Sequence, residues 1–241
     1  MRLLLTRPRE DSDRLAARLR ALGHEAVIAP LMDVHMREGC ELSLAGIQAI
    51  LATSGNGVRA IAGRTGRRDV PLYAVGPQTA DTARAYGFAL VVDSEGDAAA
   101  LADRVAATLD PKNGVVFHTA GAETAGRLRQ VLEARGFQVQ SEILYEAVAV
   151  ERLPDMAIAA IKNEALDGVM VFSPRSASIL AMLVTGAQLE GKVARLDAFC
   201  ISAATAAALA PLAFARIAVA SAPNEAAMLA LLAPPGGAVA S

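Results

Sequence analysis

Serine, glycine and asparagine residues follow one short apolar run of this 241-residue chain. The run at 47–53 passes into Ser54, Gly55 and Asn56, and the pattern then predicts a helix over 57–62. A strand that passes into a helix in this way leaves backbone N–H groups unpaired in the first helical turn, where they attract anions. The stretch therefore predicts an anion-binding site.

Similar strand-to-helix junctions recur along the chain. In the second junction a Gly-Pro turn precedes a helix expected over 79–86. Farther along the chain, the stretch 169–179 resembles the first junction and the stretch 199–209 resembles the second. A further junction near Phe117–Gly121 lies between the two pairs. We expect Thr79 and Thr205 to open their helices, and we expect the amides of 122–125 to open another. Two ordered pairs predict two similar lobes that contribute helix N-termini to a shared cleft. The polar and glycine residues at these junctions are Gly76, Gln78, Thr79, Gly121, Ser173, Arg175, Ser176 and Thr205.

Strand and helix patterns alternate along the chain, which is typical of an α/β fold with parallel sheets. We predict two similar lobes, each a parallel sheet flanked by helices, joined by a two-stranded connector. Residues 30–39 and 140–151 alternate apolar and polar side chains, which favours extended connecting segments. The expected boundaries are 1–34 plus 152–241 for the first lobe, 42–139 for the second, and 35–41 and 140–151 for the connecting strands.

The composition limits the possible functions. Hydrophobic residues make up 54% of the chain, which is enough for two cores. The formal net charge is −2, no basic block occurs, and aromatic residues are only 4%, so nucleic acid is not an expected partner. The charged N-terminus does not resemble a signal peptide, and the uncharged stretch between Asp197 and Arg216 is better explained as strand, turn and helix than as a membrane span.

Motifs for metal, nucleotide or hydrolase chemistry are absent from the sequence. Cys40 and Cys200 lack the spacing of metal ligands, so we expect reduced thiols in a cytoplasmic protein. The three histidines are dispersed, and His118 is expected to be a core residue at the end of a strand. No G-x-S-x-G, G-x-G-x-x-G or P-loop motif occurs.

An ordered series of short blocks resembles the uroporphyrinogen-III synthase family over nearly the whole chain. The downstream junction lacks the family's usual Gly-Pro turn, and Asn56 stands where many members carry arginine. The blocks are Thr6-Arg7-Pro8, Thr53–Val58, Val75–Ala80, Gly126-Arg127 followed by Leu128 and Leu132, Leu144-Tyr145, Phe172–Pro174 and Ala204–Leu209.

The resemblance implies an enzyme that cyclises hydroxymethylbilane to uroporphyrinogen III, with loss of water and inversion of ring D. It also implies that no metal, flavin or nucleotide takes part in this reaction. The implied partner is the linear tetrapyrrole, with a transient hand-off from hydroxymethylbilane synthase, and we expect a monomer with no membrane association.

The resemblance also places residues in the reaction. It places Tyr145 in the connector, where its hydroxyl could assist departure of the substrate hydroxyl. Arg7, Arg127 and Arg175 could bind carboxylates. Purely structural explanations stay open for several of these residues. Thr79 and Thr205 could be helix caps, and Ser54 and Ser173 could be turn formers only. Tyr145 could be a packed aromatic residue, and Arg127 could be a solvated charge.

Two other functions fit the same junctions. The main alternative is a non-catalytic, two-lobed cytoplasmic binding module for a small anion. The other is a flavodoxin-like protein that binds a flavin phosphate at one of the turns. Formation of the type III isomer would distinguish a synthase from a binding module.

Overall fold

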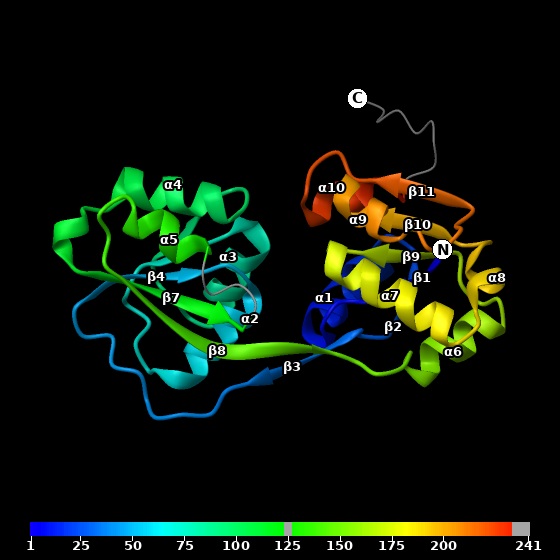
Figure 1. Ribbon diagram of the computed structural model, residues 1–241, viewed down its shortest axis with the longest axis horizontal. Coiled ribbons are helices and arrows are strands. Elements are labelled where there is room, and N and C mark those ends of the chain that lie inside the picture. Colours follow the sequence, from blue (N-terminus) through cyan, green and yellow to red (C-terminus); the bar gives the residue numbers. More distant parts are fainter. Residues whose placement is uncertain (123–126, 233–241) are drawn as a thin grey trace. The chain divides into compact units, whose positions relative to one another are not determined.

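The computed structural model describes residues 1–122 and 127–232, and the chain forms two compact units. Unit 1 comprises Met1–Asp33 and Val148–Ser241, and unit 2 comprises Val34–Ala147. Each unit contains a sheet with helices on both faces (Figure 1). The predicted α/β class with two lobes is confirmed.

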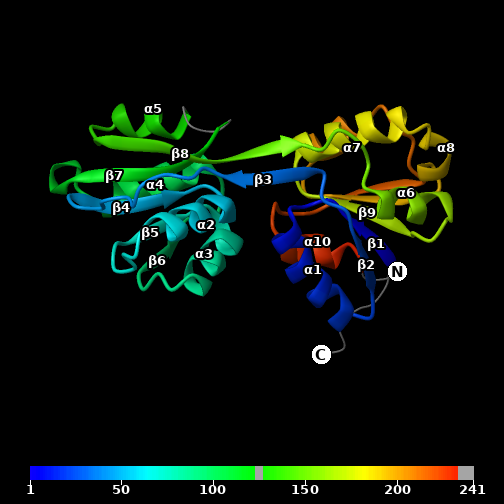
Figure 2. The same cartoon turned by 90° about the horizontal axis from the view of Figure 1, so that it is seen from below.

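Unit 1 is built on a parallel sheet with strand order β11-β10-β9-β1-β2. Side chains alternate across a strand, so Leu3 and Leu5 pack with α1 and α10 whereas Leu4 packs with α6 and α7 on the other face (Figure 2). The strands are β1 (Arg2–Leu5), β2 (Glu25–Ile28), β9 (Gly168–Val171), β10 (Asp197–Cys200) and β11 (Arg216–Val219). The helices are α1 (Arg9–Ala21), α6 (Asp155–Lys162), α7 (Pro174–Gly186), α8 (Glu190–Val193), α9 (Ala203–Ala208) and α10 (Glu225–Ala230).

Unit 2 is built on a second sheet with strand order β3-β8-β7-β4-β5-β6. Ile50 packs with α2 and α3, and Leu51 packs with α4 and α5 on the opposite face. The strands are β3 (Met32–Met36), β4 (Ile47–Ala52), β5 (Leu72–Ala74), β6 (Val91–Asp93), β7 (Val115–Gly121) and β8 (Val139–Ala149). The helices are α2 (Gly55–Arg64), α3 (Gly76–Ala85), α4 (Ala98–Thr108), α5 (Arg127–Glu133) and the 3₁₀ turn η1 (Pro111–Asn113).

Strand β8 does more than connect the two units. The segment 140–151 pairs with the earlier one as expected, because Val150 N–H donates to Leu31 O and Arg37 N–H donates to Leu144 O. These pairs run in opposite directions along the two segments, so the ladder is antiparallel. β8 is also paired in parallel with β7 over most of its length, so most of the expected connector belongs to the sheet of unit 2.

Two helices that were expected to open at a threonine begin before it. α3 starts at Gly76, so the expectation that Thr79 opens this helix is wrong, and Thr79 lies buried in its first turn. α9 starts at Ala203 with Ser202 as its cap, so the expectation for Thr205 is also wrong. Ser202 Oγ accepts the N–H of Thr205 at 3.3 Å, which is the bond that defines a serine N-cap.

The uncharged stretch before Arg216 divides into β10, α9 and loops. In the part of the chain that the structure describes, no helix is long and apolar enough to cross a membrane.

Candidate active site

Four of the predicted site residues of unit 2 lie along one edge of its sheet. Ser54 follows β4, Gly76 follows β5, Gly121 ends β7, and Tyr145 on β8 is the register partner of Gly121. Because β8, β7, β4 and β5 are consecutive parallel neighbours, the carboxyl ends of β7, β4 and β5 meet at this edge, level with Tyr145 on β8. Ligands of open α/β sheets bind outside the carboxyl ends of the strands.

Ser54 links the start of α2 to Tyr145. Its Oγ accepts the N–H of Gly57 at 3.3 Å and so caps the helix. The same Oγ lies 2.8 Å from the hydroxyl oxygen of Tyr145. Tyr145 is only 6% exposed, and its aromatic ring belongs to the core while its hydroxyl reaches the helix start. The structure thus brings together two residues that the sequence placed at separate points of the site.

Glycine is required at two positions of this edge. A Cβ atom on Gly57 would lie 2.5 Å from Thr119 Oγ1, and a Cβ atom on Gly121 would lie 2.8 Å from Cζ of Tyr145. Real Cβ atoms do not approach other atoms this closely. The expected substrate residue Gly121 is therefore in contact with the proposed catalytic tyrosine.

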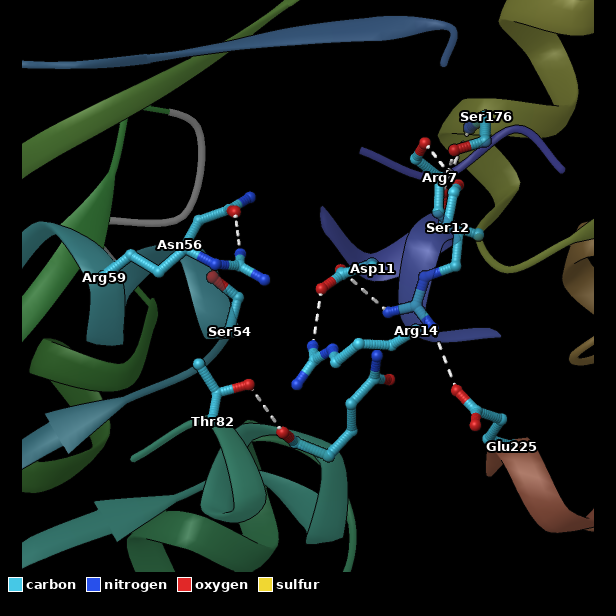
Figure 3. Close-up of polar contacts among 12 residues, drawn as sticks. Arg7, Asp11, Ser12, Arg14, Ser54, Asn56, Arg59, Thr82, Ser176 and Glu225 are labelled. Carbon is cyan, nitrogen blue, oxygen red and sulfur yellow. Dashed lines mark hydrogen bonds and ion pairs between the residues drawn. The ribbon is translucent and has the colours of Figure 1, made fainter. Parts of the chain in front are cut away.

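The first turn of α3 provides backbone amides at the same edge. Gly76 has a φ of +72°, which glycine adopts without strain, and Pro77 fixes the next residue of the turn. No side chain caps this helix. Gln78 lies in the first turn, and its carbonyl oxygen accepts the hydroxyl of Thr82 at 2.9 Å (Figure 3). N–H groups of such a turn can bind a carboxylate.

Arg59 is a candidate that the sequence reasoning missed. Its Nη1 donates to Asn56 Oδ1 at 2.6 Å, so the guanidinium lies at the first turn of α2 beside Ser54 (Figure 3). The residue is 8% exposed. Asn56 and Arg59 are three positions apart, the spacing at which helix side chains meet, and this spacing was the available signal.

Unit 1 repeats the serine junction of unit 2. Ser173 follows β9 and caps α7, where its Oγ accepts the N–H of Ser176 at 3.0 Å. The hydroxyl oxygens of these two serines are 2.9 Å apart. Arg175 lies in the same first turn. Ser173 and Ser54 thus occupy the same position, the N-cap, of α7 and α2.

Arg7 lies next to this junction and belongs to a charged network. Its Nη2 donates to Asp11 Oδ2 at 3.1 Å, and its Nη1 is 3.6 Å from Glu225 Oε2 (Figure 3). The guanidinium also lies 4.7 Å from the ring centre of Phe172. Burial lowers the pKa of Arg7, against the opposing effects of Asp11 and Glu225. The charge of Arg7 is therefore held in place by two carboxylates and one aromatic ring.

The remaining predicted residues have other surroundings. Thr205 is buried and its hydroxyl is 3.0 Å from that of Ser202. Arg127 is exposed at the start of α5, and of the expected amides at 122–125, those of 123–125 lie outside the described residues. His118 is buried within β7 rather than at its end, and desolvation lowers its pKa to about 4.

Within 1–122 and 127–232, no group of three or more His, Cys, Asp or Glu side chains is placed to hold a metal ion.

A family model described as "Uroporphyrinogen-III synthase HemD" matches residues 13–230. The chain belongs to the uroporphyrinogen-III synthase family. The match begins in α1 and ends in α10, so the uroporphyrinogen-III synthase family model includes residues of both units.

A solved structure of the same family shares the fold. Uroporphyrinogen-III synthetase from Helicobacter pylori 26695 is 15% identical, with a TM-score of 0.60 and coverage of 96% of this chain and 98% of the other. A mutant uroporphyrinogen III synthase from Thermus thermophilus is 16% identical, with a TM-score of 0.46 and coverage of 95% and 96%. The comparison with curated protein sequences gives no significant match.

Proposed function

We propose that this chain cyclises hydroxymethylbilane to uroporphyrinogen III, with loss of water and inversion of ring D, and that Tyr145 supplies a proton in this reaction. Membership of the uroporphyrinogen-III synthase family supports the activity. The observation that carries the role of Tyr145 is the position of its hydroxyl at the carboxyl edge of the sheet, 2.8 Å from Ser54 Oγ. A non-catalytic binding module for small anions is not favoured, because the family is one of enzymes.

The chemistry requires little acid–base assistance. Loss of the terminal hydroxyl gives an azafulvenium-type cation, which attacks ring D at its substituted carbon to form a spiro intermediate that fragments and closes again. Tyr145 donates a proton as the C–O bond breaks, so that the hydroxyl leaves as water. The proton that the pyrrole loses at ring closure restores the phenol. Most of the catalytic effect then comes from holding the two ends of the substrate in one geometry.

The eight carboxylates of the substrate need local positive potential, because the protein has a net charge of −2. The N-termini of α2, α3 and α7 supply it, each contributing about 0.3–1 kcal/mol and up to about 2 kcal/mol when partly buried. Arginine side chains add charge-assisted hydrogen bonds. The proposed substrate-binding residues are Arg7, Ser54, Gly55, Asn56, Arg59, Gly76, Gln78, Thr79, Gly121, Arg127, Ser173, Arg175, Ser176 and Thr205.

We also propose how the enzyme works in its pathway. It acts as a monomer and receives its substrate from hydroxymethylbilane synthase, which limits spontaneous closure to the unrearranged ring. The reaction takes place in the cytoplasm, in agreement with the two cysteines, Cys40 and Cys200, which are both free thiols. Formation of the type III isomer from hydroxymethylbilane is the experiment that tests the function.

A further inference from the structure

The pairing of β7 with β8 changes register next to Tyr145. The two strands are aligned residue by residue from Val116 with Val139 to Ala120 with Ile143. The next pair is Gly121 with Tyr145, so one residue of β8 is skipped. A bulge of this kind redirects a side chain, and bulges are frequent beside active sites. Here the shift places the tyrosine opposite a glycine.

Gly121 leaves no free space beside the phenol ring. A Cβ atom at this position would lie 2.8 Å from Cζ, 2.9 Å from the hydroxyl oxygen and 3.0 Å from Cε2 of Tyr145. The backbone is tied at the same point, because Ala122 N–H donates to the carbonyl oxygen of Tyr145 at 3.1 Å. The ring edge that carries the hydroxyl therefore rests on bare backbone, and any larger residue would displace it.

Ser54 holds the hydroxyl of the same ring. Its Oγ accepts one hydrogen bond from Gly57 N–H and lies 2.8 Å from the hydroxyl oxygen of Tyr145. A serine hydroxyl has one proton and two acceptor lone pairs. When Ser54 gives its proton to the tyrosine oxygen, the phenol keeps its own proton for transfer. The cap of α2 thus fixes the position of the serine oxygen that the phenol contacts.

We propose that Gly121 and Ser54 are positioning residues that hold the Tyr145 phenol in one orientation for proton transfer to the leaving hydroxyl. The inference rests on the proposed function, because it gives Tyr145 the role of proton donor. A role as mere packing would affect stability only. A positioning role affects turnover, and it does so only while the phenol hydroxyl is present.

Double-mutant cycles with Tyr145→Phe separate these roles. With hydroxymethylbilane as substrate, we expect Tyr145→Phe to lower kcat by roughly a hundredfold, as loss of a general acid does. Gly121→Ala and Ser54→Ala should each lower kcat by roughly tenfold or more, because a misplaced catalytic group costs turnover. In the Tyr145→Phe background, each should change kcat by less than about twofold, since coupled residues are not additive.

Matched variants control for crowding and for lost caps. Gly168→Ala in β9 brings a Cβ atom within 2.7 Å of Asp197 O, a clash like that at Gly121 but in unit 1. Asp97→Ala removes the cap of α4, whose carboxylate accepts the N–H groups of Ala99 and Ala100. Both controls should leave kcat unchanged. If Gly121→Ala does not fold, Ser54→Ala still tests the inference, since it adds no atoms.

A spectroscopic measurement tests the same point without turnover. The chain has three tyrosines, so ¹³Cζ-labelled tyrosine gives three NMR signals, and Tyr145→Phe identifies one of them. Ser54→Ala and Gly121→Ala should shift this signal, whereas Gly168→Ala should not.

The outcomes distinguish the two proposals. If Tyr145→Phe lowers kcat but the kcat losses of Ser54→Ala and Gly121→Ala are fully additive with it, the positioning role is overturned and the proposed function stands. If Tyr145→Phe leaves kcat unchanged, the catalytic role of Tyr145 fails and the inference fails with it.

Discussion

Oδ1 of Asn56 lies 2.6 Å from a terminal guanidinium nitrogen of Arg59, within the first turn of α2. A cation at a helix N-terminus adds to the positive end of the helix dipole, although this placement is unfavourable for helix stability. The first turn of α2 contains no acidic residue. The positive potential of the helix and of Arg59 therefore combine next to Ser54, at the edge where we propose that the substrate binds.

Loss of this charge should weaken substrate binding. We expect Arg59→Gln to raise KM for hydroxymethylbilane by roughly tenfold, because a hydrogen bond to a charged group contributes about 1.5–3 kcal/mol. Asn56→Ala should give a smaller increase, since it only releases the guanidinium. Steady-state kinetics measure both effects. Arg129→Gln removes the same charge from the exposed surface of α5 and should leave KM as it is. Equal KM values for Arg59→Gln and Arg129→Gln would refute the binding role.

Arg7 should affect both stability and binding. Replacement by methionine removes the partner that Asp11 and Glu225 share, while Asp11 keeps its ion pair with Arg14 and Glu225 keeps its ion pair with Arg18. We expect a loss of about 1 kcal/mol in the free energy of unfolding in urea, because neither carboxylate is left without a cation.

Arg7→Lys separates charge from geometry. It keeps the charge but loses the planar contact with Phe172 and the paired hydrogen bonds, so KM should rise while stability falls less than in Arg7→Met. Arg9→Lys is the matched control, since its ion pair with Asp13 is exposed. A KM for Arg7→Lys equal to that of Arg9→Lys would show that only the charge of Arg7 matters.

His118 should make the protein less stable in mild acid. Desolvation lowers the pKa of this buried histidine to about 4, from a usual value of 6.5. Between these pH values the unfolded chain binds the proton and the folded chain does not, so stability is present above pH 6.5 and is lost as the pH falls towards 4. The loss from this group between pH 7 and pH 5 should be roughly 2 kcal/mol.

Urea unfolding at these two pH values measures the effect. His118→Gln removes the titrating group. The free energy of unfolding that this variant loses between pH 7 and pH 5 should therefore be smaller than the wild-type loss by roughly 2 kcal/mol. The exposed His35 offers the control His35→Gln, which should keep the full pH dependence of the wild type. If His118→Gln loses as much stability on acidification as the wild type, the buried histidine is not the cause.

The two thiols should differ in reactivity. Cys40 is exposed, whereas Cys200 is buried in β10, and desolvation raises the pKa of the Cys200 thiol to about 11. The thiolate is the reactive species, so an aromatic disulfide reagent at pH 8 should modify one thiol per native chain and two per unfolded chain. Cys40→Ser should abolish the native reaction. Rapid modification of both thiols in the native protein would contradict the described burial.

Sequence reasoning succeeded where local patterns determine structure. The apolar run at 47–53 predicted a strand, and the serine junctions at Ser54 and Ser173 predicted the helices that follow. These features depend on neighbouring residues, and hydrophobic periodicity and capping preferences describe them directly.

The errors arose where contacts between residues far apart in sequence determine the structure, or where two neighbouring residues fit the same local role. The helix starts at Thr79 and Thr205 were misplaced because α3 begins at Gly76 and α9 begins after the cap Ser202, and threonine also fits a cap. Pairing of Gly121 with Tyr145 could not be predicted, since it depends on a register shift between two strands. Arg59 was missed because a charged residue in a helix is usually solvated, and only the folded chain reveals its burial.

The proportion of isomers formed from hydroxymethylbilane tests the central claim most directly. The bilane is produced in situ by hydroxymethylbilane synthase, the purified protein is added in increasing amounts, and the oxidised products are separated by chromatography. We predict that the type III isomer rises with the amount of protein until it replaces type I. Type I alone at every protein concentration would contradict the account.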